Sequence, residues 1–452
     1  MTRNILSKRE ATRRKVLKYG ALASALPWVH IRTAGAAGKL NVFYWDHWVP
    51  AGNDVIKKQT AAWAEKNKVE VNVDLITSMG QKTLLTINAE AQAKRGHDLF
   101  TISNWNVRDH ADKMEPVTDV VKRLEAQYGQ ADRVSYYLGR QKDQWFGIPS
   151  SWGTQNKGPA ARISVMKNLA GIDLPAMYPA ADGPETAAAK GWTFDAMLKA
   201  AEACSKGGMP FAIGLGTTAD NVDTAGSIFA SFGAELVDAN GKMQLNSDAV
   251  RQALEYAQQL VKWLPPESPS YDDASNNKAF VAGKTALIWN PPSAWAVAVR
   301  DAPAIAADTW HFPAPLGPKG RFMPHSMNFF GIWEFSQAKP AAKELAEFLM
   351  QAENVDARST AVMGYDLPPF QKMAEARVWD KIGPPEGTVY NYPVRKAHNQ
   401  MEHLAMMPAP PEIAVQMYNR GTPSTMLAKL KSGQTIPQVL AWAKEEIEGF
   451  LS

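Results

Sequence analysis

The sequence predicts an α/β protein of two domains that follows an N-terminal export signal. Three observations support this prediction: a basic start followed by an apolar stretch, strand and helix patterns that alternate from residue 39 onward, and a length of about 415 residues beyond the leader. One hydrophobic core rarely serves a chain of that length, so we expect two domains. Strands that alternate with helices are typical of parallel sheets flanked by helices.

The first 36 residues have the order of a secretory signal peptide. Residues 2–18 are rich in Lys and Arg, residues 19–31 are moderately apolar, and small residues follow at 34–37. A membrane-spanning helix needs about 20 apolar residues, so this stretch is too short to remain as an anchor. No cysteine lies near the small residues, so we expect no lipid attachment there.

Within the basic part, residues 12–18 resemble the twin-arginine export motif, with Val16 in a position where that motif usually has Phe. A chance pair of arginines in a basic segment is the alternative. We expect residues 1–36 to be a twin-arginine signal peptide and the mature protein to be located in the periplasm.

The net charge of the chain changes sign once the leader is set aside. The chain has 49 basic and 45 acidic residues, and the leader holds 8 of the basic residues and one of the acidic residues. The remaining 41 basic and 44 acidic residues give a net charge of −3. Nothing in this balance points to nucleic acid or an anionic lipid surface as a partner.

Strands and helices alternate at the start of the mature chain. The apolar and aromatic residues 39–45 predict a buried strand, residues 69–75 alternate as in a strand with one solvated side, and residues 98–102 predict a third strand. A helix is expected to begin at Asn53 and Asp54, and a second helix is expected over residues 81–93.

Cap residues and apolar spacing predict the later elements. Thr193 is expected to cap a helix that runs through Cys204, a single cysteine that excludes an intramolecular disulfide and reads as a buried thiol. Ser247 is expected to begin a second amphipathic helix. Residues 328–335 predict a strand, and further helices are expected from Pro340 and over about 435–450.

Signatures of catalysis and of metal or cofactor binding are absent from the sequence. There is no His-Glu-x-x-His motif, no nucleophile elbow and no phosphate-binding loop, and His398 and His403 are spaced too far apart to share one helix face. The acidic pair Asp272 and Asp273 is best explained by a solvated face. We therefore expect no catalytic residue, no metal and no cofactor, with an exported enzyme as the alternative.

Five stretches of the chain occur in an order that is known from one family. They are residues 98–105, 144–152, 229–247, 280–287, and 313–320 together with 329–339. In this order they resemble the extracellular solute-binding proteins of family 1, the carbohydrate-binding partners of ABC importers.

The resemblance implies two α/β lobes, each with a mostly parallel sheet flanked by helices. Lobe one would comprise residues 39–150 and 305–355, and lobe two residues 151–304 and 356–452. A hinge near residues 147–151 would let the lobes close on a ligand. The closed form would be recognised by the membrane subunits of an ABC permease, and the protein is expected to be a monomer.

Sugar chemistry predicts which side chains hold the ligand. A pyranose has an apolar face on which aromatic rings stack and a rim of hydroxyls that Asp and Asn can bond. Ligands in open α/β sheets bind at the carboxyl ends of strands, where this chain places aromatic and polar side chains together. The predicted residues at strand ends are Trp45, Asp46, Trp48, Asn104, Trp105, Trp152, Trp289 and Asn290.

Motif position adds further candidates for the site. The resemblance places Asp220 and Asp223 in a polar loop that faces the cleft, and Asn328, Tyr365 and Asp366 are added by the same argument.

The chain also departs from the maltose-type members of the family. It has Val222 and Ala225 where those members have aromatic residues, and residues 291–293 read Pro-Pro-Ser in place of Gly-Pro-Trp. These departures favour a small sugar or polyol over a long maltodextrin.

Other ligands of the same fold stay open at this point. A polyamine would be bound by carboxylates such as Asp46, Asp220 and Asp223 around aromatic rings. A phosphate ester would need a basic residue in the cleft, and the loops considered above offer only Arg108 nearby. A peptide is the third alternative.

Overall fold

The computed structural model describes residues 38–179, 185–374 and 400–451. The predicted signal peptide lies outside these residues. Residues 39–452 form one compact unit. Across the described residues, none of the helices combines the length and the apolar character that a membrane crossing requires.

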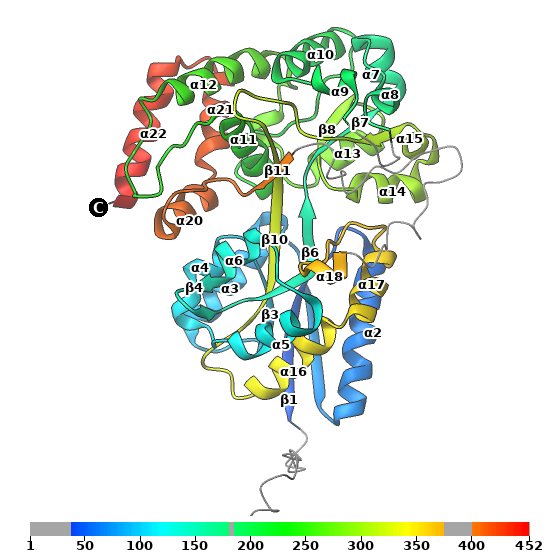
Figure 1. The fold of residues 1–452 in the computed structure, drawn as a ribbon, viewed down its shortest axis with the longest axis vertical. Helices are drawn as coiled ribbons and strands as arrows, with labels where there is room; N and C mark the ends of the chain where they lie inside the picture. The colour runs from blue at the N-terminus through cyan, green and yellow to red at the C-terminus, as the bar shows by residue number, and fades with distance from the viewer. Residues whose placement is uncertain (1–37, 180–184, 375–399, 452) are drawn as a thin grey trace, which may run out of the picture. The chain divides into compact units, whose positions relative to one another are not determined.

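A six-stranded sheet forms the centre of the first lobe, which lies at the bottom of Figure 1. In it β1 pairs in parallel with β2 and β3, β10 runs antiparallel to both β3 and β6, and β11 lies parallel to β10. The strands are β1 (Lys39–Trp45), β2 (Glu70–Ile76), β3 (Leu99–Ser103), β6 (Ile148–Asn156), β10 (Arg321–Ile332) and β11 (Gln400–His403). All but one residue of β3 are buried, whereas β2 alternates between more and less exposed positions, as its sequence predicts for an outer strand.

Helices cover this sheet on its faces. The helix α2 packs against α16 and α17, and its residues Ile56, Thr60 and Trp63, spaced four and three apart, form its buried face. The helices are α2 (Pro50–Asn67), α3 (Lys82–Ala93), α4 (Asn106–Asp109), α5 (Thr118–Tyr128), α6 (Arg133–Gly139), α16 (Lys339–Leu349), α17 (Ala352–Ala361) and α18 (Gln371–Ala374). A two-stranded hairpin of β4 (Arg140–Gln141) and β5 (Gln144–Trp145) lies beside them.

The start of α2 differs from the sequence prediction. The helix begins at Pro50, whose fixed φ suits a first-turn position, and not at Asn53. The Asn53 side chain instead accepts a hydrogen bond from the backbone N–H of His47, so it organises the loop before the helix.

The second lobe is mostly helical around a three-stranded sheet. The strand β7 (Pro159–Arg162) lies between β8 (Leu287–Trp289) and β9 (Thr309–His311). The helices are α7 (Ile163–Ala170), α8 (Leu174–Met177), α9 (Ala187–Lys190), α10 (Phe194–Lys206), α11 (Ala219–Phe232), α12 (Asp248–Leu260), α13 (Ser275–Val281), α14 (Ser293–Asp301), α15 (Pro303–Ala307), α20 (Pro411–Asn419), α21 (Thr422–Lys431) and α22 (Ile436–Leu451). Thr193 and Ser247 cap α10 and α12 through their side chains, as predicted.

The two-lobed α/β class is confirmed, but the sheet of the second lobe corrects one detail. In the described part of this lobe both pairings of β7 are antiparallel, so the expectation of a mostly parallel sheet in each lobe is wrong here. The long strands β6 and β10 pair with each other and pass between the lobes (Figure 1).

Two segments lie in a different lobe from the one expected. The strand β9 pairs with β7 of the second lobe, although residues 305–355 were assigned to lobe one. Conversely, α17 packs on α2 and α18 packs on α5, although residues from 356 onward were assigned to lobe two. The other lobe boundaries stay a prediction.

Candidate functional site

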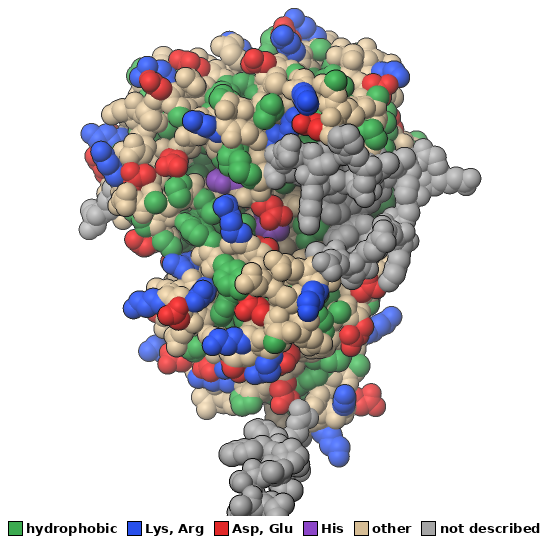
Figure 2. Space-filling view, in the orientation of Figure 1, with side chains coloured by type: hydrophobic (Ala, Val, Ile, Leu, Met, Phe, Trp, Pro, Cys, Tyr) green, Lys and Arg blue, Asp and Glu red, His purple; other side chains and the backbone are tan. Residues whose placement is uncertain are grey.

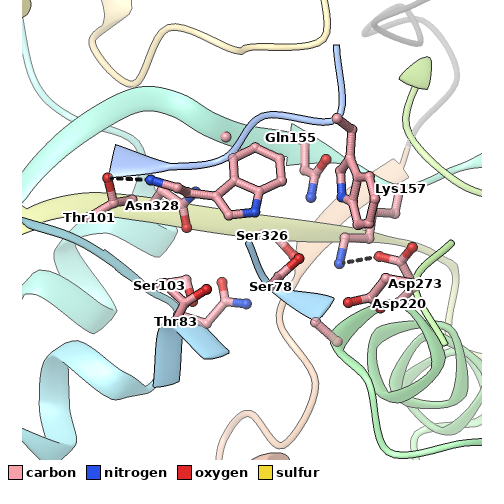
Figure 3. A pocket seen from close by; sticks show the side chains of 15 residues that line it. Ser78, Thr83, Thr101, Ser103, Gln155, Lys157, Asp220, Asp273, Ser326 and Asn328 are labelled. Carbon is pink, nitrogen blue, oxygen red and sulfur yellow. Dashed lines mark hydrogen bonds and ion pairs between the residues drawn. The ribbon is translucent and has the colours of Figure 1, made fainter. Parts of the chain in front are cut away.

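A polar cavity lies between the two lobes, and side chains of both lobes and of the crossing segments line it (Figure 3). Its lining residues are Trp45, Trp48, Ser78, Thr83, Thr101, Ser103, Asn104, Gly153, Gln155, Lys157, Ala219, Asp220, Asp273, Ser326 and Asn328. This cavity has a volume of about 100 Å³, and an adjoining cavity of about 440 Å³ shares several of these residues and extends toward Tyr418 and Asn419. Small-molecule sites commonly have volumes of roughly 300–1,000 Å³, so the two cavities together suit a small ligand.

Two tryptophans, one at the end of β1 and one just after it, bring aromatic surface to the cavity. The rings of Trp45 and Trp48 both line it, with centroids 6.5 Å apart and planes nearly perpendicular. Trp45 is mostly buried and Trp48 is more exposed. This pair confirms that the end of β1 reaches the cavity, and the two rings supply faces on which an apolar ligand surface could stack.

A buried hydrogen-bonded pair, His47 and Asp366, packs against Trp45. Val49 donates its backbone N–H to His47 Nδ1 at 2.9 Å, so Nε2 carries the ring proton and donates to Asp366 Oδ1 at 3.0 Å. The same carboxylate oxygen accepts the backbone N–H of Gly153 at 2.9 Å. Asp366 therefore ties the loop after β1 to the crossing strand β6, and it supports the cavity without lining it.

Trp152 and Tyr365 belong to the same support. Trp152 is fully buried and donates its indole N–H to the carbonyl of Trp45 at 3.1 Å. Tyr365 is also buried and lies 6.2 Å from the Trp45 ring. Neither residue lines the cavity, so the structure gives them the role of positioning Trp45.

Gly153 allows the floor of the cavity to form. Its φ of +83° lies in the left-handed region, and a Cβ there would collide with Asn328 Nδ2 and with the ring of Trp45. Asn328 lines the cavity and donates through Nδ2 to the carbonyl of Trp152 at 2.9 Å. A glycine at this position thus lets β6, β10 and Trp45 approach one another.

The end of β3 places one predicted residue at the cavity and turns the next one away. Asn104 lines it, with φ of +48°, and its side chain accepts from the Met327 N–H and donates to the Tyr418 hydroxyl. Trp105 is fully buried and donates its indole N–H to the carbonyl of Ala405 at 2.9 Å. The expectation that Trp105 stacks on a ligand is therefore corrected, because its ring packs between lobe one and the C-terminal segment.

Three further predicted residues do not line the cavity. Trp289 is 2% exposed, and Asn290 is buried with its amide donating to Asn277 and Ser293. Asp46 accepts a hydrogen bond from the Asn53 side chain at 2.8 Å in the loop before α2. Trp289 and Asn290 belong to the core of the second lobe, and Asp46 shapes the loop that presents the tryptophans.

A charged cluster forms the wall that the second lobe contributes. The first turns of α11 carry Asp220 and Asp223, three residues apart and so on one face of the helix. Lys157 Nζ lies 2.8 Å from Asp220 Oδ1 and 2.9 Å from Asp223 Oδ2. Ser326 donates to the same Asp223 oxygen at 2.8 Å, so Lys157 and Ser326 both engage Oδ2 of Asp223. Of the two carboxylates, Asp220 alone lines the cavity.

The environment fixes the charge of Lys157. Burial by itself would lower the pKa of this ammonium group, but the carboxylates of Asp220 and Asp223 hold the pKa of Lys157 well above its usual value. Lys157 is 1% exposed, so its positive charge is directed at these two carboxylates and not at solvent.

Asp273 is a half-buried acidic residue that the sequence interpretation missed. Burial, reinforced by the negative charge of Asp220, raises the pKa of Asp273 to about 6. Its Oδ1 is buried and has no hydrogen-bond partner among the described residues. The explanation of Asp272 and Asp273 as a solvated face is therefore wrong for Asp273, which lines the cavity.

Other lining residues were also missing from the prediction. Lys157 lies directly after β6, and only its pairing with a distant helix makes it part of the site. Small polar side chains at Ser78, Thr83, Thr101 and Ser103 also line the cavity, but such residues carry no sequence signal of their own.

A group of potential metal ligands lies away from this cavity. Asp132, His325 and Glu402 place ligand atoms within 4.8 Å of one another. The two carboxylates face opposite nitrogens of the His325 ring, each at 3.9 Å, and Asp132 already caps α6. One ion could not use both nitrogens, so we assign no metal to this group.

The charged side chains of the outer surface differ from those of the cavity. On the face in Figure 2, Lys and Arg side chains are interspersed with Asp and Glu over both lobes. Among the described residues, Lys157 is the single basic residue that lines either part of the cavity, against the acidic Asp220, Asp272 and Asp273. The acidic character is thus a local property of the site.

Two α/β lobes with a polar, aromatic-lined cavity between them define the periplasmic binding protein class of fold. Solved structures agree at the level of the fold: maltose-bound MalE3 of T. maritima aligns with a TM-score of 0.70 and 18% identity over 92% of this chain and 100% of that one. A solute-binding protein of Thermotoga lettingae bound with alpha-D-tagatose aligns with a TM-score of 0.71 and 16% identity over 92% of this chain and 100% of that one. A sugar transporter protein of Arthrobacter chlorophenolicus with bound laminaribiose aligns with a TM-score of 0.71 and 15% identity over 91% of this chain and 99% of that one.

The sequence profile of the bacterial extracellular solute-binding proteins matches residues 50–356, which is more than half of the chain. The chain belongs to this family. A comparison with curated protein sequences found no match.

Proposed function

We propose that this chain is the periplasmic substrate-binding component of an ABC importer, which captures a sugar or polyol between its lobes and delivers it to membrane permease subunits. The observation that carries the proposal is the cavity between the lobes, where the rings of Trp45 and Trp48 face the same space as a set of hydroxyl, amide and carboxylate groups. Family membership and the sugar ligands bound in solved structures of the same fold support it.

Within the site we assign stacking to the two tryptophans and hydroxyl binding to the polar rim. Asn104 and Asn328 present amide groups from lobe one and from β10, and Asp220 presents a carboxylate from lobe two. Aromatic rings suit the C–H face of a sugar, and planar polar groups suit its hydroxyls. Trp152, Tyr365 and Asp366 act as positioning residues that fix Trp45.

Closure of the two lobes would convert binding into a signal for the permease. Segments of both lobes and of the crossing strands line the cavity, so a ligand that touches all of them favours the closed arrangement. We infer that the protein works as a monomer, has no catalytic activity, and reaches the periplasm by way of a twin-arginine signal in residues 1–36.

The lining residues weigh against two alternative ligands. A phosphate ester needs an available cation, whereas Lys157, the single basic residue that lines the cavity in the described part of the chain, is paired with two carboxylates. A peptide needs an extended groove with backbone partners, whereas this space is small. A polyamine remains the second candidate, because Asp220 and Asp273 lie near aromatic rings.

Ligand-induced stabilisation tests the proposal directly. Tryptophan fluorescence and melting temperature would be measured with a panel of sugars, polyols, polyamines and sugar phosphates. A true ligand at about 100 times its dissociation constant adds about 2.7 kcal/mol to the stability of the folded state. A response to a polyamine or phosphate ester, with none to any sugar or polyol, would overturn the carbohydrate assignment, and turnover of any compound would overturn the binding-only role.

A further inference from the structure

The two walls of the cavity carry unequal charge. The lining residues of lobe one are aromatic or uncharged, whereas Asp220 and Asp273 line the opposite wall (Figure 3). A neutral sugar needs hydrogen-bond acceptors, but it does not need two neighbouring carboxylates. The second carboxylate therefore calls for a positively charged group on the ligand.

Lys157 does not neutralise the charges of both Asp220 and Asp273. It contacts Asp220 and Asp223 at 2.8 and 2.9 Å, and no ion pair joins it to Asp273 among the described residues. Three carboxylates thus share a single ammonium group in a partly desolvated space. Charges in such a space attract an opposite charge more strongly than they would in water.

One oxygen of Asp273 remains without a partner, although the Thr218 side chain and the backbone N–H of Asp220 interact with its carboxyl group. This oxygen, Oδ1, is buried and has no hydrogen-bond partner in the described parts of the chain. The cost of a buried acceptor without a donor is removed when a ligand supplies one. The raised pKa of Asp273, about 6, reflects its burial and the neighbouring Asp220 carboxylate, and a cation placed beside both would reverse that shift.

We propose that the ligand is a hydroxylated compound with a protonated amino group, an amino sugar or amino polyol, and that its ammonium group binds at Asp220 and Asp273. This inference rests on the proposed function and narrows its ligand class. The tryptophans and the amides of Asn104 and Asn328 bind the carbon skeleton and hydroxyls, and the acidic wall selects the amine. An ammonium group supplies three donors to the carboxylate oxygens.

Matched ligand sets test the charge of the ligand separately from its shape. Isothermal titration calorimetry would compare D-glucose with D-glucosamine and N-acetyl-D-glucosamine, the galactose counterparts, and sorbitol with 1-amino-1-deoxysorbitol. In at least one set, we expect the amine to bind about tenfold or more tightly than its neutral parent, as a charge-assisted hydrogen bond implies. N-acetylation should remove that advantage, because it keeps the substituent and abolishes the charge.

The variant Asp273→Asn tests whether the acidic wall binds the ammonium group of the ligand. It should reduce the ratio of amine to neutral affinity toward one, whereas a purely structural effect would weaken both members equally. Asp143→Asn removes the same charge from a side chain that is 96% exposed, outside the cavity lining, and should leave the ratio unchanged. Asp273 takes part in no ion pair among the described residues, so its substitution removes no salt bridge.

The pH dependence gives an independent measurement. The amine of 1-amino-1-deoxysorbitol stays protonated between about pH 5 and about pH 7, whereas Asp273 ionises across this range. The affinity of the protein for 1-amino-1-deoxysorbitol should therefore rise with pH, by at most about tenfold per pH unit below the pKa of Asp273. The affinity for sorbitol should change less.

The outcomes separate the inference from the proposed function. If neutral sugars or polyols bind as tightly as their amines in every set, the inference fails and the proposed function stands. If putrescine binds and no hydroxylated compound does, or if nothing in the panel binds, both fail.

Discussion

The two walls of the cavity differ in both their chemistry and their origin. Lobe one supplies tryptophans and uncharged polar groups from the ends of neighbouring parallel strands, where the rule for open α/β sheets places a ligand. Lobe two supplies carboxylates from the start of α11 and from the loop before α13. The first wall would recognise the shape and the apolar surface of the ligand, and the second wall would recognise its charge.

The second wall is also the one whose integrity depends on a buried ammonium group. Lys157 follows the crossing strand β6, and its carboxylate partners lie on α11. The tryptophans of the first wall are instead supported by packing, by the hydrogen bond between His47 and Asp366, and by the hydrogen bond from the Trp152 indole. Substitutions should therefore separate the two walls: one should respond mainly in stability and the other mainly in affinity.

The largest effect is expected at Lys157. Lys157→Met removes the buried ammonium and leaves Asp223, which is 1% exposed, without its ionic partner. Removing one member of a buried pair typically costs about 3–5 kcal/mol in the free energy of unfolding, to be measured by urea denaturation. Arg300→Met, which breaks an exposed pair with Asp301, is the control and should leave stability almost unchanged. A small loss for Lys157→Met would show that the carboxylates are satisfied in another way.

The first wall should respond through affinity. Trp48→Ala removes a ring that lines the cavity and is only partly buried, so it should weaken binding of the ligand by about 2 kcal/mol with little loss of stability. Calorimetric titration beside a melting curve measures both quantities. Equal affinity of the variant and the parent protein would exclude Trp48 from the site.

A third substitution tests the contrast between the ends of β1 and β3. Trp105→Phe removes the hydrogen bond to the Ala405 carbonyl and part of a fully buried ring, so it should cost about 1–2 kcal/mol of stability. Affinity for the ligand should stay within about twofold, since Trp105 does not line the cavity. A selective loss of affinity would restore the stacking role that the sequence suggested.

The same contrast shows what could be predicted from the sequence. The strands β1 and β3 were recognised from their apolar runs, and both of their ends do contribute residues to the cavity. Which side chain faces it depends on backbone angles that the pattern does not encode. After β1 the chain runs on to Trp48 before α2 begins, whereas after β3 Asn104 takes a φ of +48° and α4 starts two residues later, which turns Trp105 away.

The charged wall was harder to predict for a different reason. Asp220 was assigned by motif position, but Lys157 and Asp273 acquire their roles only through contacts across more than 50 residues of sequence. Two adjacent aspartates look the same in sequence whether both are solvated or one of them has a buried oxygen, as Asp273 has. Only the packing of α11 against the loop before α13 distinguishes them.

The smallest expected effect concerns the pH dependence of stability, and Asp273→Asn measures it. The pKa of Asp273 is raised in the folded state, so its contribution to stability is fully present below the unfolded pKa near 3.8 and is lost as pH rises through about 6. Without ligand, the variant should therefore be more stable than the parent protein at pH 7, and this difference should shrink toward pH 4. Urea denaturation across this range checks the sign. A variant that is less stable at pH 7 would mean that the ionised carboxylate is already satisfied in the free protein, and the acidic wall would then have no unmet charge to offer a ligand.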